Sequence, residues 1–168
     1  GLRNYTVKDI QDLKGVRQLV QINPETPEEA AAAEEAGIDA IKMRFEPTAP
    51  QSAIERRQAA PHTFMTYGMR LTPYASKTEA LRAAFDAMEA GADSVMCQWS
   101  LEFVETVAAA GVPIEGHVGL VPRKSTWTGG LRAVGKTVEE AVKIHQDIKD
   151  LENAGAWCVE CELVPVPI

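Results

Sequence analysis

Alanine-rich, helix-like stretches alternate with short apolar segments along most of the chain. Four of these stretches end in Ala-Gly, at Gly37, Gly91, Gly111 and Gly155, and apolar positions follow each glycine closely. Glycine just past the last helical turn takes a positive φ angle without steric cost, so it ends a helix. An apolar run directly after such a glycine is typical of a buried parallel strand. The repeat therefore predicts alternating helices and parallel strands.

The same pattern predicts where the individual elements lie. Strands are expected at residues 17–22, 39–45, 63–69, 94–98, 113–120 and 158–164. Helices are expected at residues 6–12, 27–36, 78–90, 100–110 and 138–154, with a further short helix at 52–59. Thr137 begins a capping-box pattern, and Thr26 precedes a first-turn proline and two glutamates, so both threonines mark helix starts.

Alternation of strands and helices with short links predicts an α/β fold, and specifically a (β/α)8 TIM-type barrel. An open doubly wound sheet is the alternative, although no glycine-rich phosphate loop follows a predicted strand. Six βα units are visible in the 168 residues, whereas a closed barrel usually needs about 200 residues or more. We therefore expect residues 1–168 to form a single barrel domain from which the C-terminal βα units are missing.

Charge and composition narrow the classes of function. The net charge is −7, which disfavours a general nucleic-acid or anionic-membrane binder. No segment approaches the roughly 20 apolar residues of a membrane span, and the polar N-terminus lacks a signal-peptide core, so a cytoplasmic protein is expected. Cys158 and Cys161 form a C-x-x-C pair, but a strand places residues three apart on opposite faces. That geometry disfavours redox or metal chemistry for this pair.

Two residues near predicted strand ends are candidates for chemistry, because barrel active sites lie at the carboxyl ends of the strands. His117 lies close to Gly116 and Gly119, which leave it open to a ligand; alternatively, it caps a turn or binds a core carbonyl. Glu162 lies near the end of the strand predicted at 158–164. A carboxylate buried there is costly to desolvate and is a candidate general acid or base; alternatively, it points into solvent.

The segments around these residues resemble a known enzyme family. The chain has G-H-V-G-L-V-P at 116–122, G-G at 129–130, L-E-N-A-G-A at 151–156 and E-L-V-P at 162–165. The order and spacing are similar to those of the ketopantoate hydroxymethyltransferase family. The resemblance implies a (β/α)8 barrel related to phosphoenolpyruvate mutase and isocitrate lyase. It also implies hydroxymethyl transfer from methylenetetrahydrofolate to 3-methyl-2-oxobutanoate in pantothenate biosynthesis, a Mg²⁺ ion, and a homo-oligomer, which is a decamer in that family.

The resemblance assigns roles to some residues and leaves others unmatched. Glu162 matches the family's catalytic glutamate, which removes the proton next to the ketone, and His117 matches the histidine that lines that site. The metal ligands are not retained. Phe45 and Gly68 stand at the positions of the two metal aspartates, and the K-x-E motif is replaced by residues 96–98. Glu46 could replace one metal ligand if the register slips by one residue.

The strand ends that lose these ligands gain arginines. Arg44 and Arg70 are expected to bind the substrate's carboxylate in place of the metal, since guanidinium binds carboxylate in a planar fork. Gln98 could add a side-chain carbonyl to the same substrate-binding set. Two alternatives to the family reaction stay open. One is a metal-independent lyase or aldolase acting on another anionic oxo acid, and the other is a catalytically inactive binding paralogue with its pocket filled by apolar side chains.

Overall fold

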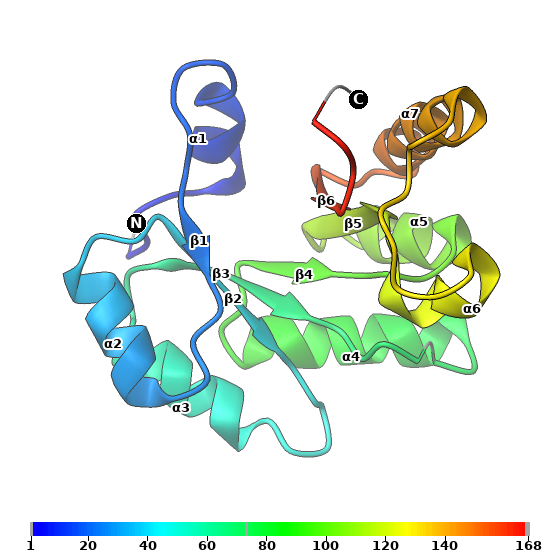
Figure 1. Ribbon diagram of the computed structural model, residues 1–168. Helices are drawn as coiled ribbons and strands as arrows, with labels where there is room; N and C mark the ends of the chain where they lie inside the picture. Colours follow the sequence, from blue (N-terminus) through cyan, green and yellow to red (C-terminus); the bar gives the residue numbers. More distant parts are fainter. Residues whose placement is uncertain (1, 73, 167–168) are drawn as a thin grey trace. The chain divides into compact units, whose positions relative to one another are not determined.

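Strands and helices alternate along residues 2–72 and 74–166, the part of the chain that the computed structural model describes (Figure 1). The elements are α1 (Val7–Asp12), β1 (Gln21–Ile22), α2 (Pro27–Glu35), β2 (Ala40–Arg44), α3 (Gln51–Ala59), β3 (Phe64–Gly68), α4 (Lys77–Glu89), β4 (Ser94–Met96), α5 (Leu101–Ala109), β5 (Ile114–Gly119), the 3₁₀ turn η1 (Pro122–Lys124), α6 (Ser125–Thr128), α7 (Val138–Asn153) and β6 (Cys158–Glu162). The predicted α/β alternation is confirmed.

The order of the strands distinguishes between the two predicted architectures. Hydrogen bonding follows the order β1-β2-β3-β4-β5-β6, which is the order along the chain, and the pairs β1–β2, β2–β3 and β5–β6 are parallel. A doubly wound sheet reverses its strand order at one point, so that alternative is excluded for the described strands. Closure into an eight-stranded barrel stays a prediction, since the described part of the chain carries six strands.

Helix boundaries follow the local signals in the sequence. Gly37, Gly91, Gly111 and Gly155 all have positive φ angles, of 75°, 103°, 81° and 95°. The predicted capping box at Thr137 is only half formed: its side chain accepts the N–H of Glu140, whose carboxylate binds other backbone groups. The turn η1 and helix α6 were not predicted, because they follow a strand without a clear periodic pattern. No helix in the described ranges combines the length and apolar character needed to cross a membrane.

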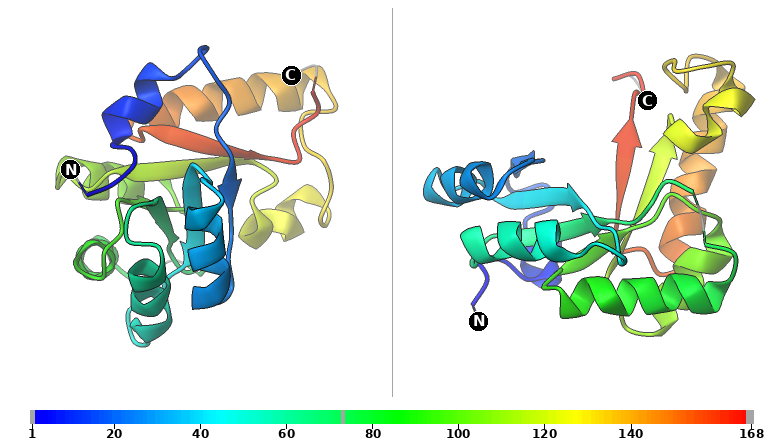
Figure 2. Two further views of the ribbon diagram at one scale, coloured as in Figure 1. Left: turned by 90° about the vertical axis from the view of Figure 1, so that its left-hand side faces the viewer. Right: turned by 90° about the horizontal axis from the view of Figure 1, so that it is seen from below.

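The chain falls into two compact units, residues 1–70 with 82–95 and residues 71–81 with 96–168. In the first unit, α2 and α3 lie side by side (Figure 2). The ring of Phe45 stacks on Tyr67 with centroids 5.5 Å apart, and the Tyr67 hydroxyl donates to the carbonyls of Ala53 on α3 and Ala90. Phe45 and Tyr67 therefore belong to the packed layer between strands and helices.

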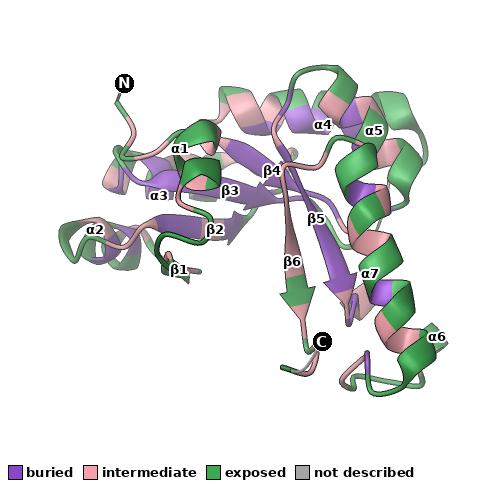
Figure 3. Ribbon diagram, turned by 90° about the horizontal axis from the view of Figure 1, so that it is seen from above, coloured by how far each residue is buried: buried purple, intermediate pink, exposed green. Residues whose placement is uncertain are grey.

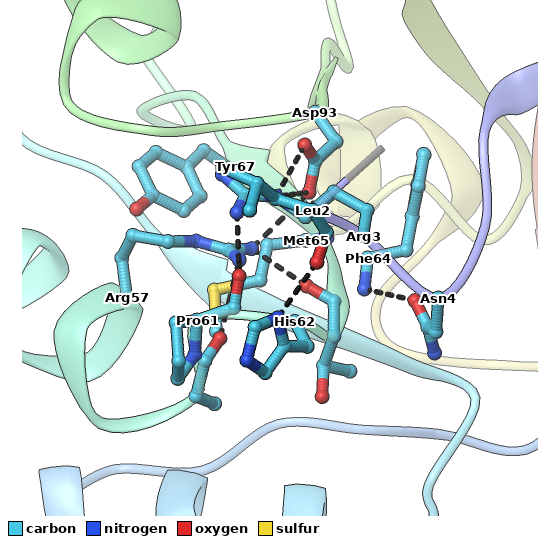
Figure 4. A network of polar contacts seen from close by, with 12 residues as sticks. Leu2, Arg3, Asn4, Arg57, Pro61, His62, Phe64, Met65, Tyr67 and Asp93 are labelled. Carbon is cyan, nitrogen blue, oxygen red and sulfur yellow. Dashed lines mark hydrogen bonds and ion pairs between the residues drawn. The ribbon is translucent and has the colours of Figure 1, made fainter.

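The first unit also contains an ionic network at the amino-terminal ends of β3 and β4 (Figure 4). The Asp93 carboxylate accepts from Arg3 at 2.9 Å, from Arg57 at 3.1 Å and from the Met65 N–H at 2.8 Å. Arg57 also donates to the Thr63 carbonyl at 2.8 Å, and burial lowers the pKa of its guanidinium although Asp93 raises it. In barrels, interactions at this end of the strands serve stability rather than chemistry.

In the second unit, α5 and α7 pack against β5. Figure 3 shows β5 buried along most of its length, whereas β6 is half-buried to exposed. Strand β6 ends at Glu162, earlier than predicted, because Leu163 takes a positive φ angle of 49° that breaks the extended conformation. β4 likewise ends at Met96, so Gln98 lies beyond the strand.

Candidate active site

His117 and Glu162 meet at the carboxyl ends of the neighbouring strands β5 and β6. The register pairs His117 with Glu160 and Gly119 with Glu162. His117 Nε2 lies 3.0 Å from a Glu162 carboxylate oxygen, which is ion-pair distance. The imidazole is 1% exposed and the Glu162 side chain 34% exposed. The Glu162 side chain is thus neither fully buried nor fully exposed. It contacts the buried His117 on one side and remains accessible to solvent on the other.

Gly116 and Gly119 allow this close approach of the elements. A Cβ at Gly116 would lie 2.7 Å from a methyl group of Leu151 on α7, so the Leu151 side chain would have to shift. A Cβ at Gly119 would lie 2.3 Å from the carbonyl oxygen of Glu162, and the φ angle of Gly119 is +81°. The same carbonyl accepts the N–H of Leu120 at 2.9 Å. Gly119 therefore allows the backbone of β5 to approach the Glu162 carbonyl, and Gly116 leaves room for the Leu151 side chain.

Replacing Gly119 with alanine should lower the free energy of unfolding by at least about 2 kcal/mol, because the positive φ and the clash with the Glu162 carbonyl act together. Gly129→Ala is the matched control. Gly129 has a similar φ of +78° with nothing within 4 Å of the added Cβ, so only the conformational cost of about 1 kcal/mol is expected. Urea unfolding of both variants measures the difference; equal losses would contradict the assigned clash.

A third residue, the acidic Glu160, joins the pair and was missed from the sequence. Glu160 lies two positions before Glu162 and opposite His117, and a strand presents alternate residues on one face. Ligand atoms of His117, Glu160 and Glu162 all lie within 4.8 Å of one another. The alternation C-V-E-C-E at 158–162 was the available signal, since it places both glutamates on the same face.

The loop between α6 and α7 runs beside the end of β6. The N–H of Val134 donates to the carbonyl of Leu163 at 3.1 Å. Glu140 fixes this loop by accepting from the Arg132 guanidinium at 2.6 Å and from the backbone N–H groups of Gly135 and Lys136 at 2.9 Å. The hydrogen bond from Arg132, followed by those two backbone bonds, lowers the pKa of Glu140 to about 2. The charged form of Glu140 therefore orders a loop next to Glu162.

Replacing Glu140 with glutamine should lower Tm at neutral pH, because an amide cannot accept three charge-assisted bonds as well as a carboxylate does. The pKa of Glu140 falls from 4.5 to about 2 on folding, so its contribution is present above pH 4.5 and is lost as the pH falls towards 2. The Tm difference between wild type and variant should therefore shrink over that range in calorimetry. A difference independent of pH would show that ionisation of Glu140 is not responsible.

The other predicted site residues are divided between the two units. Arg44, Arg70 and Glu46 are exposed residues of the first unit, and Glu46 accepts from the Thr48 hydroxyl at 3.0 Å. Gln98 belongs to the second unit, where its side-chain oxygen is buried and has no hydrogen-bond partner among the described residues. A buried oxygen in this state is suited to a ligand donor. Substrate binding by Arg44, Arg70 and Gln98 stays a prediction.

The residues at the family's metal positions do not fit a magnesium ion, which requires oxygen ligands in octahedral geometry. Phe45 packs on Tyr67, and Gly68 has no side chain. Met96 is buried, and burial raises the pKa of the neighbouring Cys97 thiol to about 12, so this thiol stays protonated. Among the described residues, His117, Glu160 and Glu162 form a group of three potential metal ligands, and Glu46 does not belong to it.

Solved structures define the class of this fold. The chain is similar to 2,3-dimethylmalate lyase, a member of the PEP mutase/isocitrate lyase superfamily, with a TM-score of 0.62 and 15% identity over 94% of this chain and 64% of that chain. It is also similar to oxaloacetate acetylhydrolase, with a TM-score of 0.63 and 11% identity over 93% of this chain and 62% of that chain. The class is therefore an α/β fold with the strand arrangement of that superfamily.

The sequence comparisons identify the family within this class. A sequence profile of ketopantoate hydroxymethyltransferase matches residues 41–168. The chain is 36% identical to 3-methyl-2-oxobutanoate hydroxymethyltransferase of Thermus thermophilus (95% of this chain, 69% of the relative), and 31% identical to that of Caldivirga maquilingensis (97% and 69%). The chain belongs to the ketopantoate hydroxymethyltransferase family, which confirms the resemblance of its glycine and glutamate motifs.

Proposed function

We propose that the protein transfers a hydroxymethyl group from methylenetetrahydrofolate to 3-methyl-2-oxobutanoate, the reaction of the family to which it belongs. The observation that carries the proposal is the approach of His117 Nε2 to the Glu162 carboxylate at 3.0 Å. Both residues lie at strand ends and within the motifs that the chain shares with the family. Glu162 remains one-third exposed, which leaves its carboxylate accessible to a substrate.

In this proposal Glu162 accepts the proton from the carbon next to the ketone, and the electron pair of that C–H bond passes into an enolate. Water cleaves the two C–N bonds of the methylene bridge, which releases tetrahydrofolate and leaves the one-carbon unit as formaldehyde. The enolate carbon then forms the new C–C bond to that carbon, and the resulting alkoxide takes back the proton from Glu162 to become the hydroxyl group. His117, fixed by burial, holds the carboxylate in position for proton transfer. General base catalysis by a positioned carboxylate typically contributes 10²–10⁴-fold to a rate.

Because the family's magnesium positions do not fit a magnesium ion, no step of the proposal depends on one. Binding of the substrate's acid group by Arg44 or Arg70 remains part of the proposal, since a guanidinium supplies the positive charge that a metal would otherwise provide. Arg44→Ala should then raise KM for the oxo acid more than it lowers kcat.

The proposal is tested by incubating the purified protein with 3-methyl-2-oxobutanoate and methylenetetrahydrofolate, with and without EDTA. Formation of the hydroxymethylated acid, followed by mass spectrometry, is the expected result. Formation that persists in EDTA supports a metal-independent reaction. If neither condition yields the product while the substrate binds in calorimetry, the proposed transfer is wrong for this protein.

A further inference from the structure

A histidine and two glutamates place three potential metal ligands on adjoining strands of the second unit. His117 lies on β5, directly opposite Glu160 on β6, and Glu162 follows two positions later on the same face. Their ligand atoms lie within 4.8 Å of one another. From this arrangement we propose that His117, Glu160 and Glu162 bind a divalent transition-metal ion of the zinc class.

The distances suit a shared ion. Ligand atoms about 2.1 Å from one zinc ion lie roughly 3.0–3.5 Å from each other, depending on geometry. The Nε2 of His117 and the Glu162 oxygen are already 3.0 Å apart. Glu160 is half-buried, and its ligand atom lies within 4.8 Å of those of His117 and Glu162. The three ligands are therefore close enough to share one ion after local adjustment of their side chains.

Burial and charge support the same conclusion. The imidazole is 1% exposed and so is held in one orientation, whereas Glu162 is 34% exposed and gives an ion access from solvent. Two carboxylates on the same face of one strand repel each other when both are charged, and a divalent ion bound between them removes that repulsion. An imidazole with two carboxylates suits Zn²⁺, Co²⁺ or Fe²⁺, whereas Mg²⁺ prefers oxygen ligands alone.

This inference goes beyond the proposed function and does not depend on it. The three ligands lie on β5 and β6, whereas the family's metal positions correspond to Phe45, Gly68 and residues 96–98. A carboxylate that coordinates an ion cannot accept a proton at the same time. An ion at these ligands therefore competes with the proposed role of Glu162 as a base.

The experiment is a calorimetric titration of ZnCl₂ into the EDTA-treated and dialysed full chain, without substrate. One ion per chain is expected, and Glu160→Gln should raise Kd at least about tenfold. Glu152→Gln is the matched control, since Glu152 is exposed on α7 and the same charge is removed. No zinc binding, or equal binding by both variants, would overturn the proposal.

The cobalt spectrum provides a second measurement. Cys158 and Cys161 are not joined in a disulfide and lie close to the proposed ligands in the sequence, and thiolates bind Zn²⁺ and Co²⁺ well. A Co²⁺ complex with d–d bands but no thiolate charge-transfer band is expected, and these bands should weaken in Glu160→Gln. A thiolate band would assign the ion to the cysteines and overturn the proposal. Because neither measurement uses substrate, their failure is distinct from failure of the proposed transfer.

Discussion

Replacing Glu162 with glutamine should slow hydrogen–deuterium exchange at the carbon next to the ketone of 3-methyl-2-oxobutanoate by about 10²–10⁴-fold. Exchange in D₂O reports removal of the proton by itself, without the folate substrate. Glutamine keeps the size of the side chain and its approach to His117 but cannot accept the proton. Proton NMR of the oxo acid in D₂O, with EDTA-treated protein, measures the rate directly.

The control for this variant is Glu152→Gln, which removes one exposed charge from α7 and should leave the exchange rate unchanged. Thermal unfolding followed by circular dichroism establishes that both variants are folded. If folded Glu162→Gln exchanges the proton as fast as wild type, Glu162 is not the base. The role of His117 can be separated in the same assay, because a positioning residue should lower kcat with little change in KM.

Replacing Asp93 with alanine should lower the free energy of unfolding by about 3 kcal/mol. The Arg57 side chain is 9% exposed and that of Asp93 is 16% exposed, so removing the carboxylate leaves a largely buried guanidinium without its counter-charge. The Met65 N–H also loses its acceptor. Urea unfolding with a two-state fit gives the change, and Asp93→Asn, which retains the side-chain volume, should show most of the same loss.

Glu35→Ala is the corresponding surface control, since Glu35 is exposed at the end of α2. A change within about 0.5 kcal/mol is expected for such a position. If Asp93→Ala were no more destabilising than Glu35→Ala, the network in Figure 4 would contribute little to stability. The network lies at the amino-terminal ends of β3 and β4, whereas His117 and Glu162 lie at the carboxyl ends of β5 and β6. Barrels divide stability and chemistry between the two strand ends in this way.

Local signals in the sequence were sufficient for the alternation of elements and for the positions of most helix ends. The reason is that a glycine with positive φ, such as Gly37 or Gly155, and an N-capping threonine such as Thr26 act within one helical turn. The family motifs also pointed to His117 and Glu162, because strand ends carry the chemistry in this class of fold. Boundaries were less accurate where a strand ends through a single backbone angle, as at Leu163.

Contacts between residues far apart in the chain were decided only by the tertiary structure. The orientation of Phe45 towards Tyr67, the placement of Glu160 opposite His117 and the pairing of Arg57 with Asp93 each depend on strand register or helix packing. Alternation along one strand shows which of its residues share a face, as for Glu160 and Glu162, but it does not show which residue of another element lies opposite. A shift of one residue in register moves a side chain to the opposite face. The sequence by itself therefore determined the family and the order of elements, and it pointed to His117 and Glu162, which the structure places 3.0 Å apart. The second acidic residue of the site, Glu160, the buried ionic network and the steric need for glycine at position 119 emerged only when the tertiary structure brought these groups together.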